Sequence, residues 1–136
     1  ANRLYRPSYI SLETALSHYH LIPETVYSVT SVTTRSTREF DVMGTSYSYR
    51  TIKRRAFFGY RAVQKNGETF LIAEKVKALA DYLYFVYLKG AKVNSRLRLK
   101  EVPRRELLEC LAAFEHPGLV DWYKNDLKIP DHRILR

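Results

Sequence analysis

The sequence predicts an α+β fold: a single domain with an about five-stranded, mainly antiparallel sheet, preceded by a short helix and packed by two or three C-terminal helices. Residues 26–73 alternate apolar and polar side chains with the period of two that is typical of strands. Residues 73–90 and 103–114 instead repeat apolar side chains at helical spacing. The 136 residues, 46% of them hydrophobic, suffice for one core and would be marginal for two, so we treat residues 1–136 as one domain.

The first expected helix lies within "PSYISLETALSHYHLIPE", residues 7–24. Ser11 is a suitable N-cap, and Glu13 follows in the first turn, where the helix dipole favours an anion. Apolar side chains recur at intervals of three and four residues from Leu12 to Tyr19, which gives this helix one apolar face. Pro23 ends it.

The alternating region divides into strands at its turn residues. "MGTS", residues 43–46, supplies one turn, and Asn66-Gly67 supplies another with a strong hairpin signal. Because the connections are short, antiparallel neighbours are the simplest arrangement. The expected strands are residues 26–33, 38–42, 46–52, 57–63 and 68–73.

The C-terminal half is expected to be mostly helical. Residues 73–90 are apolar on most sides of a helix that ends at Gly90, so this helix should be central. Residues 94–102 alternate and indicate a short edge strand. An amphipathic helix over residues 103–114 and a last turn or short helix over 116–127 follow. We expect the tail, residues 128–136, to be loosely held.

The charge of the chain indicates an anionic partner. Lys and Arg number 23 against 14 Asp and Glu, which gives a formal net charge of +9. Nucleic acid, an anionic membrane surface and an acidic protein all fit this balance. No apolar run approaches the roughly 20 residues of a membrane span, and the single cysteine, Cys110, allows no internal disulfide. We expect a cytoplasmic protein without a membrane partner.

Two parts of the chain concentrate the positive charge. The first, within residues 50–61 and free of acidic residues, comprises Arg50, Lys53, Arg54, Arg55 and Arg61. The second, opposed only by Glu101, comprises Lys89, Lys92, Arg96, Arg98, Lys100, Arg104 and Arg105. Joined into one stripe, they would form a phosphate-binding surface. The alternative is a solvated face that only keeps the chain soluble.

Aromatic residues interleave with the first group: Tyr47, Tyr49, Phe57, Phe58 and Tyr60. Such rings can stack on nucleic-acid bases. Their alternate strand positions favour a place in the core instead. The sequence contains no recognition-helix or RNA-binding signature, so we expect binding through charge without readout of base sequence.

Catalytic groups are not apparent in the sequence. The motifs of zincins, serine hydrolases and P-loop enzymes are missing. Asp41 and Glu68 would be the carboxylates of a metal-dependent nuclease, but two-metal chemistry needs several that converge. His18 and His20 are expected at the surface or at its boundary with the core, and Cys110 in the core. We therefore expect no catalytic residue, bound metal or cofactor.

Four segments carry a resemblance to a known family. They are "RPSYISLETALSHYHLIPE", "VYSVTSVTTRSTREF", "FFGY" and "IAEKVKALADYLY", in this order and at plausible spacings over most of residues 6–88. The chain thereby resembles the C-terminal domain of AbiEi-family antitoxins of type IV (abortive-infection) toxin–antitoxin pairs. It departs from the family pattern at His20, where similar sequences often have glycine, and at Lys77 in a segment that lacks the family's proline.

The resemblance implies a function. It implies a domain that neutralises a nucleotidyltransferase-like toxin, directly or indirectly, and that adds a basic surface to the binding of operator DNA and to autorepression. The winged helix-turn-helix usual at the N-terminus of this family has no counterpart in residues 1–136. The residues that match the family or extend its basic surface are Arg35, Arg38, Arg50, Lys53, Arg54, Arg55, Arg61, Arg96 and Arg98, with Glu74, Lys75 and Asp81 in a motif that can equally serve helix capping and ion pairing. A small metal-dependent nuclease and a plain protein-binding module are the alternatives.

Overall fold

The structure is a computed structural model, and it describes residues 2–127. The expected loose tail lies outside these residues. In chain order the elements are β1 (Ser8–Ile10), α1 (Leu12–His18), β2 (Val29–Thr33), β3 (Arg38–Val42), β4 (Thr45–Thr51), the 3-10 turn η1 (Arg54–Ala56), β5 (Tyr60–Lys65), β6 (Glu68–Ala73), α2 (Lys75–Lys89), the 3-10 turn η2 (Leu99–Glu101), α3 (Arg104–Ala112) and α4 (Leu119–Asn125).

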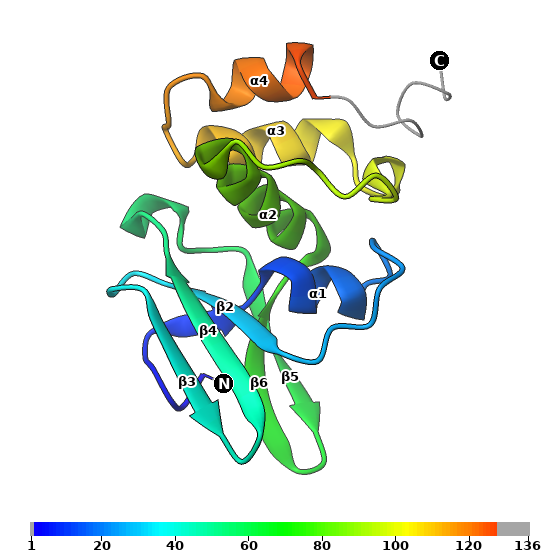
Figure 1. Cartoon of the computed structure of the whole chain (residues 1–136). Coiled ribbons are helices and arrows are strands. Elements are labelled where there is room, and N and C mark those ends of the chain that lie inside the picture. The colour runs from blue at the N-terminus through cyan, green and yellow to red at the C-terminus, as the bar shows by residue number, and fades with distance from the viewer. Residues whose placement is uncertain (1, 128–136) are drawn as a thin grey trace.

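The strands form one sheet with the order β3-β4-β2-β1-β6-β5, and helices α2, α3 and α4 stack at one end of it (Figure 1). Three neighbouring pairs are antiparallel: β1 with β2, β3 with β4, and β5 with β6. The pairs β1 with β6 and β2 with β4 are parallel. The sheet thus consists of two wings, β3-β4-β2 and β6-β5, that β1 joins.

This arrangement confirms the α+β class and corrects its details. The sheet has six strands rather than about five, because the sequence prediction missed β1. The short helix α1 therefore follows a strand instead of preceding the whole sheet. Antiparallel pairs are only a small majority, because β2 pairs with β4 in parallel while β3 occupies the edge.

The turns follow the backbone freedom of their residues. Asn66 and Gly67 both have positive φ, 54° and 79°, as the two-residue turn between β5 and β6 requires. Met43 and Gly44 repeat this conformation between β3 and β4, with φ of 52° and 83°. His20 adopts a φ of 62° just beyond α1, so the histidine takes the left-handed conformation for which glycine is favoured.

Helix α2 forms the centre of the core. All residues from Lys77 to Val86 are buried, which confirms the expectation that this helix is central. It contacts α1, α3, α4 and β6, and it ends at Gly90 in the left-handed conformation, as the sequence predicts. Leu16, Leu79 and Leu111, from three different helices, belong to the same buried cluster.

Two sequence predictions were wrong. Residues 94–102 form a turn and η2 rather than an edge strand, with Leu97 and Leu99 buried and Arg98 between them exposed. The strand expected over residues 57–63 begins only at Tyr60, because η1 and the turned residues up to Gly59, whose φ is 76°, precede it. Among the described residues, no helix is long and apolar enough to cross a bilayer.

Candidate nucleic-acid interface

The 3-10 turn η1 exposes three consecutive cations. Ile52 and Ala56 are buried at its two ends and anchor it to the core, while Lys53, Arg54 and Arg55 between them are exposed. Backbone hydrogen bonds close the turn, from the N–H of Ala56 to the carbonyl of Lys53 and from the N–H of Phe57 to that of Arg54. The turn therefore fixes the backbone from which the three cationic side chains extend.

These cations line an open hollow of about 740 Å³ together with Glu115. Arg55 forms an ion pair with the Glu115 carboxylate, and Lys53 Nζ donates to the Glu115 backbone carbonyl at 3.3 Å. Both partners of the ion pair are more than half exposed, so it contributes little to stability. Arg54 has no acidic partner among residues 2–127, which leaves the hollow positively charged.

Arg35 and Arg38 gather around a different anchor. The Arg35 guanidinium lies 4.2 Å from the ring centre of Tyr5, and that of Arg38 lies 5.8 Å from it. Tyr5 is buried and donates to the Ser36 carbonyl at 2.9 Å, so it holds the loop between β2 and β3. Arg35 also donates to the Arg6 carbonyl at 3.1 Å. These two cations form a second basic site on the β3 side.

Arg50 and Arg61 belong to neither site. Arg50 is half-buried, and its guanidinium lies 4.4 Å from the ring centre of Phe85 in α2. Arg61 is exposed on β5, the sheet edge opposite β3, with a guanidinium nitrogen 3.5 Å from the Tyr19 hydroxyl. The sheet therefore separates Arg38 from Arg61.

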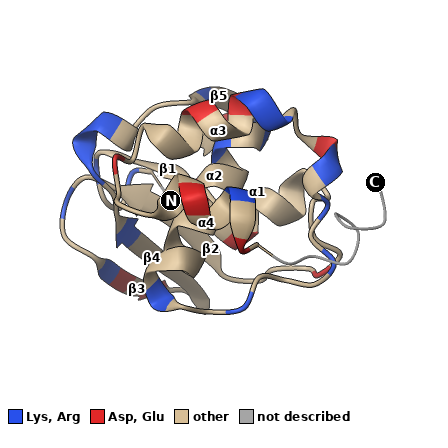
Figure 2. Ribbon diagram, turned by 90° about the horizontal axis from the view of Figure 1, so that it is seen from above, with Lys and Arg blue, Asp and Glu red and all other residues tan. Residues whose placement is uncertain are grey.

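Arg96 and Arg98 project from the segment between α2 and η2. Their side chains are exposed, and backbone bonds to Asn94 Oδ1 and to the Leu21 carbonyl hold the segment in place. Seen from above, Lys and Arg are distributed around the outline of the molecule (Figure 2). The two charged groups of the sequence thus frame the molecule, and at η1 three consecutive cations are exposed together.

The interleaved aromatic residues divide between core and surface. Tyr49 is fully buried, which fits the core interpretation. Phe58 and Tyr60 are 38% and 37% exposed, and Phe57 is half-buried. The Tyr60 ring stacks on that of the buried Tyr9, with centroids 4.8 Å apart. Phe57 and Tyr60 therefore offer partly exposed rings close to η1.

The motif residues Glu74, Lys75 and Asp81 have different surroundings. Glu74 is exposed at the N-cap of α2, where its backbone carbonyl accepts from Ala78 but its side chain makes no capping bond. Lys75 is half-buried in the first turn. Asp81 is fully buried two turns further on. Only Asp81 takes part in ion pairing, and its partner is Lys77.

Lys77 and Asp81 form a buried polar network, although sequence reasoning had treated Lys77 only as a departure from the family pattern. Lys77 Nζ donates to Asp81 Oδ1 at 2.5 Å, and both side chains are 0% exposed. The hydroxyls of Ser11 and Tyr9 donate to the other carboxylate oxygen, Oδ2, at 2.7 and 3.0 Å. Lys77 also donates to the Tyr9 hydroxyl at 2.9 Å. The signal available in the sequence was the i,i+4 spacing of a lysine and an aspartate inside an apolar helix.

The electrostatics of this network are those of a buried ion pair. Burial raises the pKa of Asp81, while the Lys77 charge and the hydrogen bonds from Lys77, Ser11 and Tyr9 oppose the rise. Burial also raises the pKa of Tyr9, and the Asp81 charge adds to this effect. Ser11, at the N-cap of α1, therefore gives its hydroxyl to Asp81 rather than to its own helix. The network joins β1, α1 and α2 through side chains.

Other candidate reactive groups are spread through the structure. Cys110 lies in the core, as expected, and burial raises the pKa of its thiol. His18 and His20 are exposed, in agreement with the surface interpretation. Asp41 on β3 and Glu68 on β6 lie on strands that three others separate, so the two carboxylates proposed for a nuclease do not meet. Within residues 2–127, no three His, Cys, Asp or Glu side chains converge as a metal site would require.

Comparison of the chain with protein-family models, curated proteins and solved structures finds no match.

Proposed function

We propose that this chain is a non-enzymatic, cytoplasmic regulator of the antitoxin type that binds DNA through charge. In this proposal it acts with a winged helix-turn-helix on operator DNA, and it neutralises a nucleotidyltransferase-like toxin, directly or indirectly. The support for the antitoxin role is the resemblance of residues 6–88 to AbiEi-family antitoxins. The support for DNA binding is the exposed, anchored group of cations on η1.

The η1 turn is the observation that carries DNA binding. Lys53, Arg54 and Arg55 follow one another in the chain, and Glu115 alone opposes them in the hollow that they line. Lysine and arginine bind phosphate oxygens and release the counterions condensed on the duplex. The sequence carries no recognition-helix or RNA-binding signature, so we expect binding that is indifferent to base sequence and that weakens steeply with salt.

Charge reversal at η1 tests this surface. The variant Arg54→Glu/Arg55→Glu should weaken binding to a fluorescent duplex at low salt and should flatten the dependence of log Kd on log salt. Thermal unfolding should change little, because both side chains are exposed. The matched control is Lys65→Glu/Lys124→Glu, which changes the net charge equally at exposed positions outside the hollow. Equal weakening by both variants would mean that net charge, and not η1, governs binding.

Growth rescue tests the antitoxin role. The chain is expressed together with the nucleotidyltransferase-like toxin encoded beside it, and colony survival is followed. Survival of the colonies would assign antitoxicity to these residues, whereas loss of survival with abundant, folded protein would contradict the proposal. Negligible affinity for duplex DNA even at low salt, in a chain that still rescues growth, would instead favour a plain protein-binding module.

A further inference from the structure

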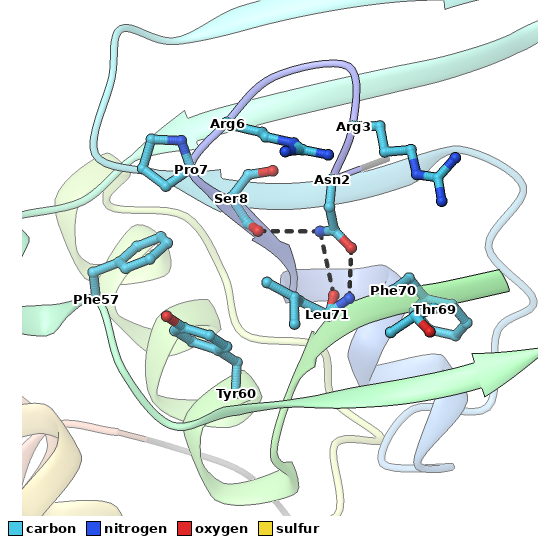
Figure 3. Close-up of a pocket in the computed structure, with 10 residues that line it drawn as sticks. All are labelled: Asn2, Arg3, Arg6, Pro7, Ser8, Phe57, Tyr60, Thr69, Phe70 and Leu71. Atoms are coloured by element: carbon cyan, nitrogen blue, oxygen red, sulfur yellow. Dashed lines mark hydrogen bonds between the residues drawn. The ribbon is translucent and has the colours of Figure 1, made fainter.

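A pocket with polar and apolar walls, separate from the η1 hollow, lies beside the N-terminal segment. This pocket of about 400 Å³ opens between residues 2–8, β6 and the segment that leads into β5 (Figure 3). This size falls within the range of about 300–1,000 Å³ that is usual for small-molecule sites. Arg3, Arg6 and Ser8 supply its polar groups, and Phe57, Tyr60 and Leu71 much of its apolar wall.

The pocket exists because β1 and β6 pair over a single position. Ile10 pairs with Ile72, and beyond this point the side-chain amide of Asn2 connects the two strands. Asn2 Nδ2 donates to the carbonyls of Ser8 and Leu71 at 3.1 and 3.4 Å, and the Leu71 N–H donates to Asn2 Oδ1 at 2.5 Å. The amide thus replaces a peptide group and forms a fixed boundary of the pocket.

The charged groups of the pocket are available to a ligand, and a buried hydroxyl lies beside them. Arg3 and Arg6 are exposed, and neither forms an ion pair with any acidic residue in the described part of the chain. Ser8 is only 2% exposed, and its hydroxyl has no hydrogen-bond partner. In Figure 3 this hydroxyl points to the side of the pocket where the Arg6 guanidinium lies. A buried hydroxyl without a partner is costly, and a ligand that accepts a hydrogen bond from it would remove this cost.

The apolar wall favours a flat ring. Phe57 and Tyr60 lie with ring centroids 5.4 Å apart, and Tyr60 is held from behind by its stack on the buried Tyr9. Leu71 faces them across the pocket (Figure 3). Two free guanidinium groups beside partly exposed, supported aromatic rings match an anion that is attached to an aromatic body.

We propose that this pocket binds a nucleoside monophosphate, either free or at the end of a strand. The phosphate would lie between Arg3 and Arg6 and accept a hydrogen bond from the Ser8 hydroxyl, while the base would pack against Phe57 and Tyr60. The pocket shares no lining residue with the η1 hollow, so this inference does not rest on the proposed function.

Amide chemical shifts measured during titration with AMP, adenosine and inorganic phosphate test the proposal. AMP should shift the amides of Ser8, Tyr60 and Leu71 in a saturable manner, and each of the two fragments should bind at least about tenfold more weakly because it lacks half of the contacts. Equal affinity for inorganic phosphate, or shifts centred on η1, would overturn the assignment. A dinucleotide with a 5′-phosphate distinguishes a free nucleotide from the end of a strand. Tighter binding than that of AMP would indicate a strand end, and weaker binding would indicate a free nucleotide.

Two serine variants provide a matched pair. Ser8→Ala should leave stability unchanged or slightly raised, since it removes an unpartnered hydroxyl, yet it should weaken AMP binding about tenfold. Ser31 has the other buried, unpartnered hydroxyl in residues 2–127, and it does not line the pocket. Ser31→Ala should therefore leave AMP binding unchanged. Equal affinities of Ser8→Ala and Ser31→Ala for AMP would show that Ser8 does not contact the ligand. The variant Arg54→Glu/Arg55→Glu should leave AMP binding intact even if it no longer binds DNA.

Discussion

Replacing Lys77 and Asp81 singly and together should reveal a strong coupling between them. Lys77→Met leaves the Asp81 carboxylate fully buried without its cation. Asp81→Asn leaves the buried Lys77 ammonium beside a neutral amide instead of a carboxylate. Removing one partner of a buried ion pair typically costs about 3–5 kcal/mol. We expect a loss of this size in the free energy of unfolding of each single variant.

The double variant should be much less affected than the sum of the two. Tyr9 and Ser11 both donate to Oδ2 of Asp81, whereas Lys77 contacts Oδ1. An asparagine oxygen in the place of Oδ2 therefore keeps both hydroxyl bonds, and its NH₂ group then lies against an apolar methionine side chain. The remaining loss is that of one buried amide without a full set of partners, about 1–3 kcal/mol. The two single losses sum to about 6–10 kcal/mol, so the coupling free energy should be at least about 3 kcal/mol.

Urea denaturation of the four proteins at pH 7, followed by circular dichroism, measures this coupling. The slope of the free energy against urea should be the same for all four, which shows that the same surface is exposed on unfolding. A double variant whose loss equals the sum of the single losses would refute the reasoning, because the two residues would then act through separate packing. A double variant as unstable as the worse single one would show that the amide does not retain the hydroxyl bonds.

Two further predictions concern His18 and the glycines. Burial lowers the pKa of His18, and Arg61 and other nearby cations lower it further. The NMR titration midpoint of His18 should therefore lie below the ordinary 6.5 and should rise in Arg61→Ala. An unchanged midpoint in this variant would exclude a contribution from Arg61. Because this pKa is lowered on folding, the small contribution of His18 to stability is present above pH 6.5 and is lost as the pH falls through its folded pKa. Gly59→Ala should destabilise the protein more than Gly67→Ala does in thermal unfolding. Both glycines have a positive φ, 76° and 79°, which costs about 1–2 kcal/mol for alanine. Of the two, only Gly59 would place its new methyl group against another side chain, 2.9 Å from Lys77 Cγ. Equal losses would mean that Lys77 moves aside freely.

The helices and hairpins were predictable because their signals are local. Asn66-Gly67 determines its turn through two positive φ angles, and Gly90 ends α2 in the same way. Strand β1 could not be found by the same reasoning, since three residues between Pro7 and the N-cap Ser11 are too few for an alternating pattern. The parallel pairs also escaped prediction, because they join strands that are not consecutive in the sequence.

The candidate sites were predictable in composition but not in arrangement. The exposure of Lys53, Arg54 and Arg55 agrees with the sequence interpretation. The separation of Arg38 from Arg61 depends on the strand order, which no local pattern contains. The pocket beside Ser8 depends on a contact between Asn2 and Leu71, which are separated by about half of the chain, so it emerges only from the tertiary structure.

The Asn2 amide also determines how mechanical load would enter the sheet. A pull on the N-terminal segment reaches the three Asn2 bonds before it reaches the pairing of Ile10 with Ile72, because Asn2 precedes β1 in the chain. The hydrogen bonds of Asn2 would therefore bear the load first, and the pairing of β1 with β6 would bear it after they break. Tension at this end would first part the two wings of the sheet along β1, while the network of Tyr9 and Asp81 still ties β1 to α2.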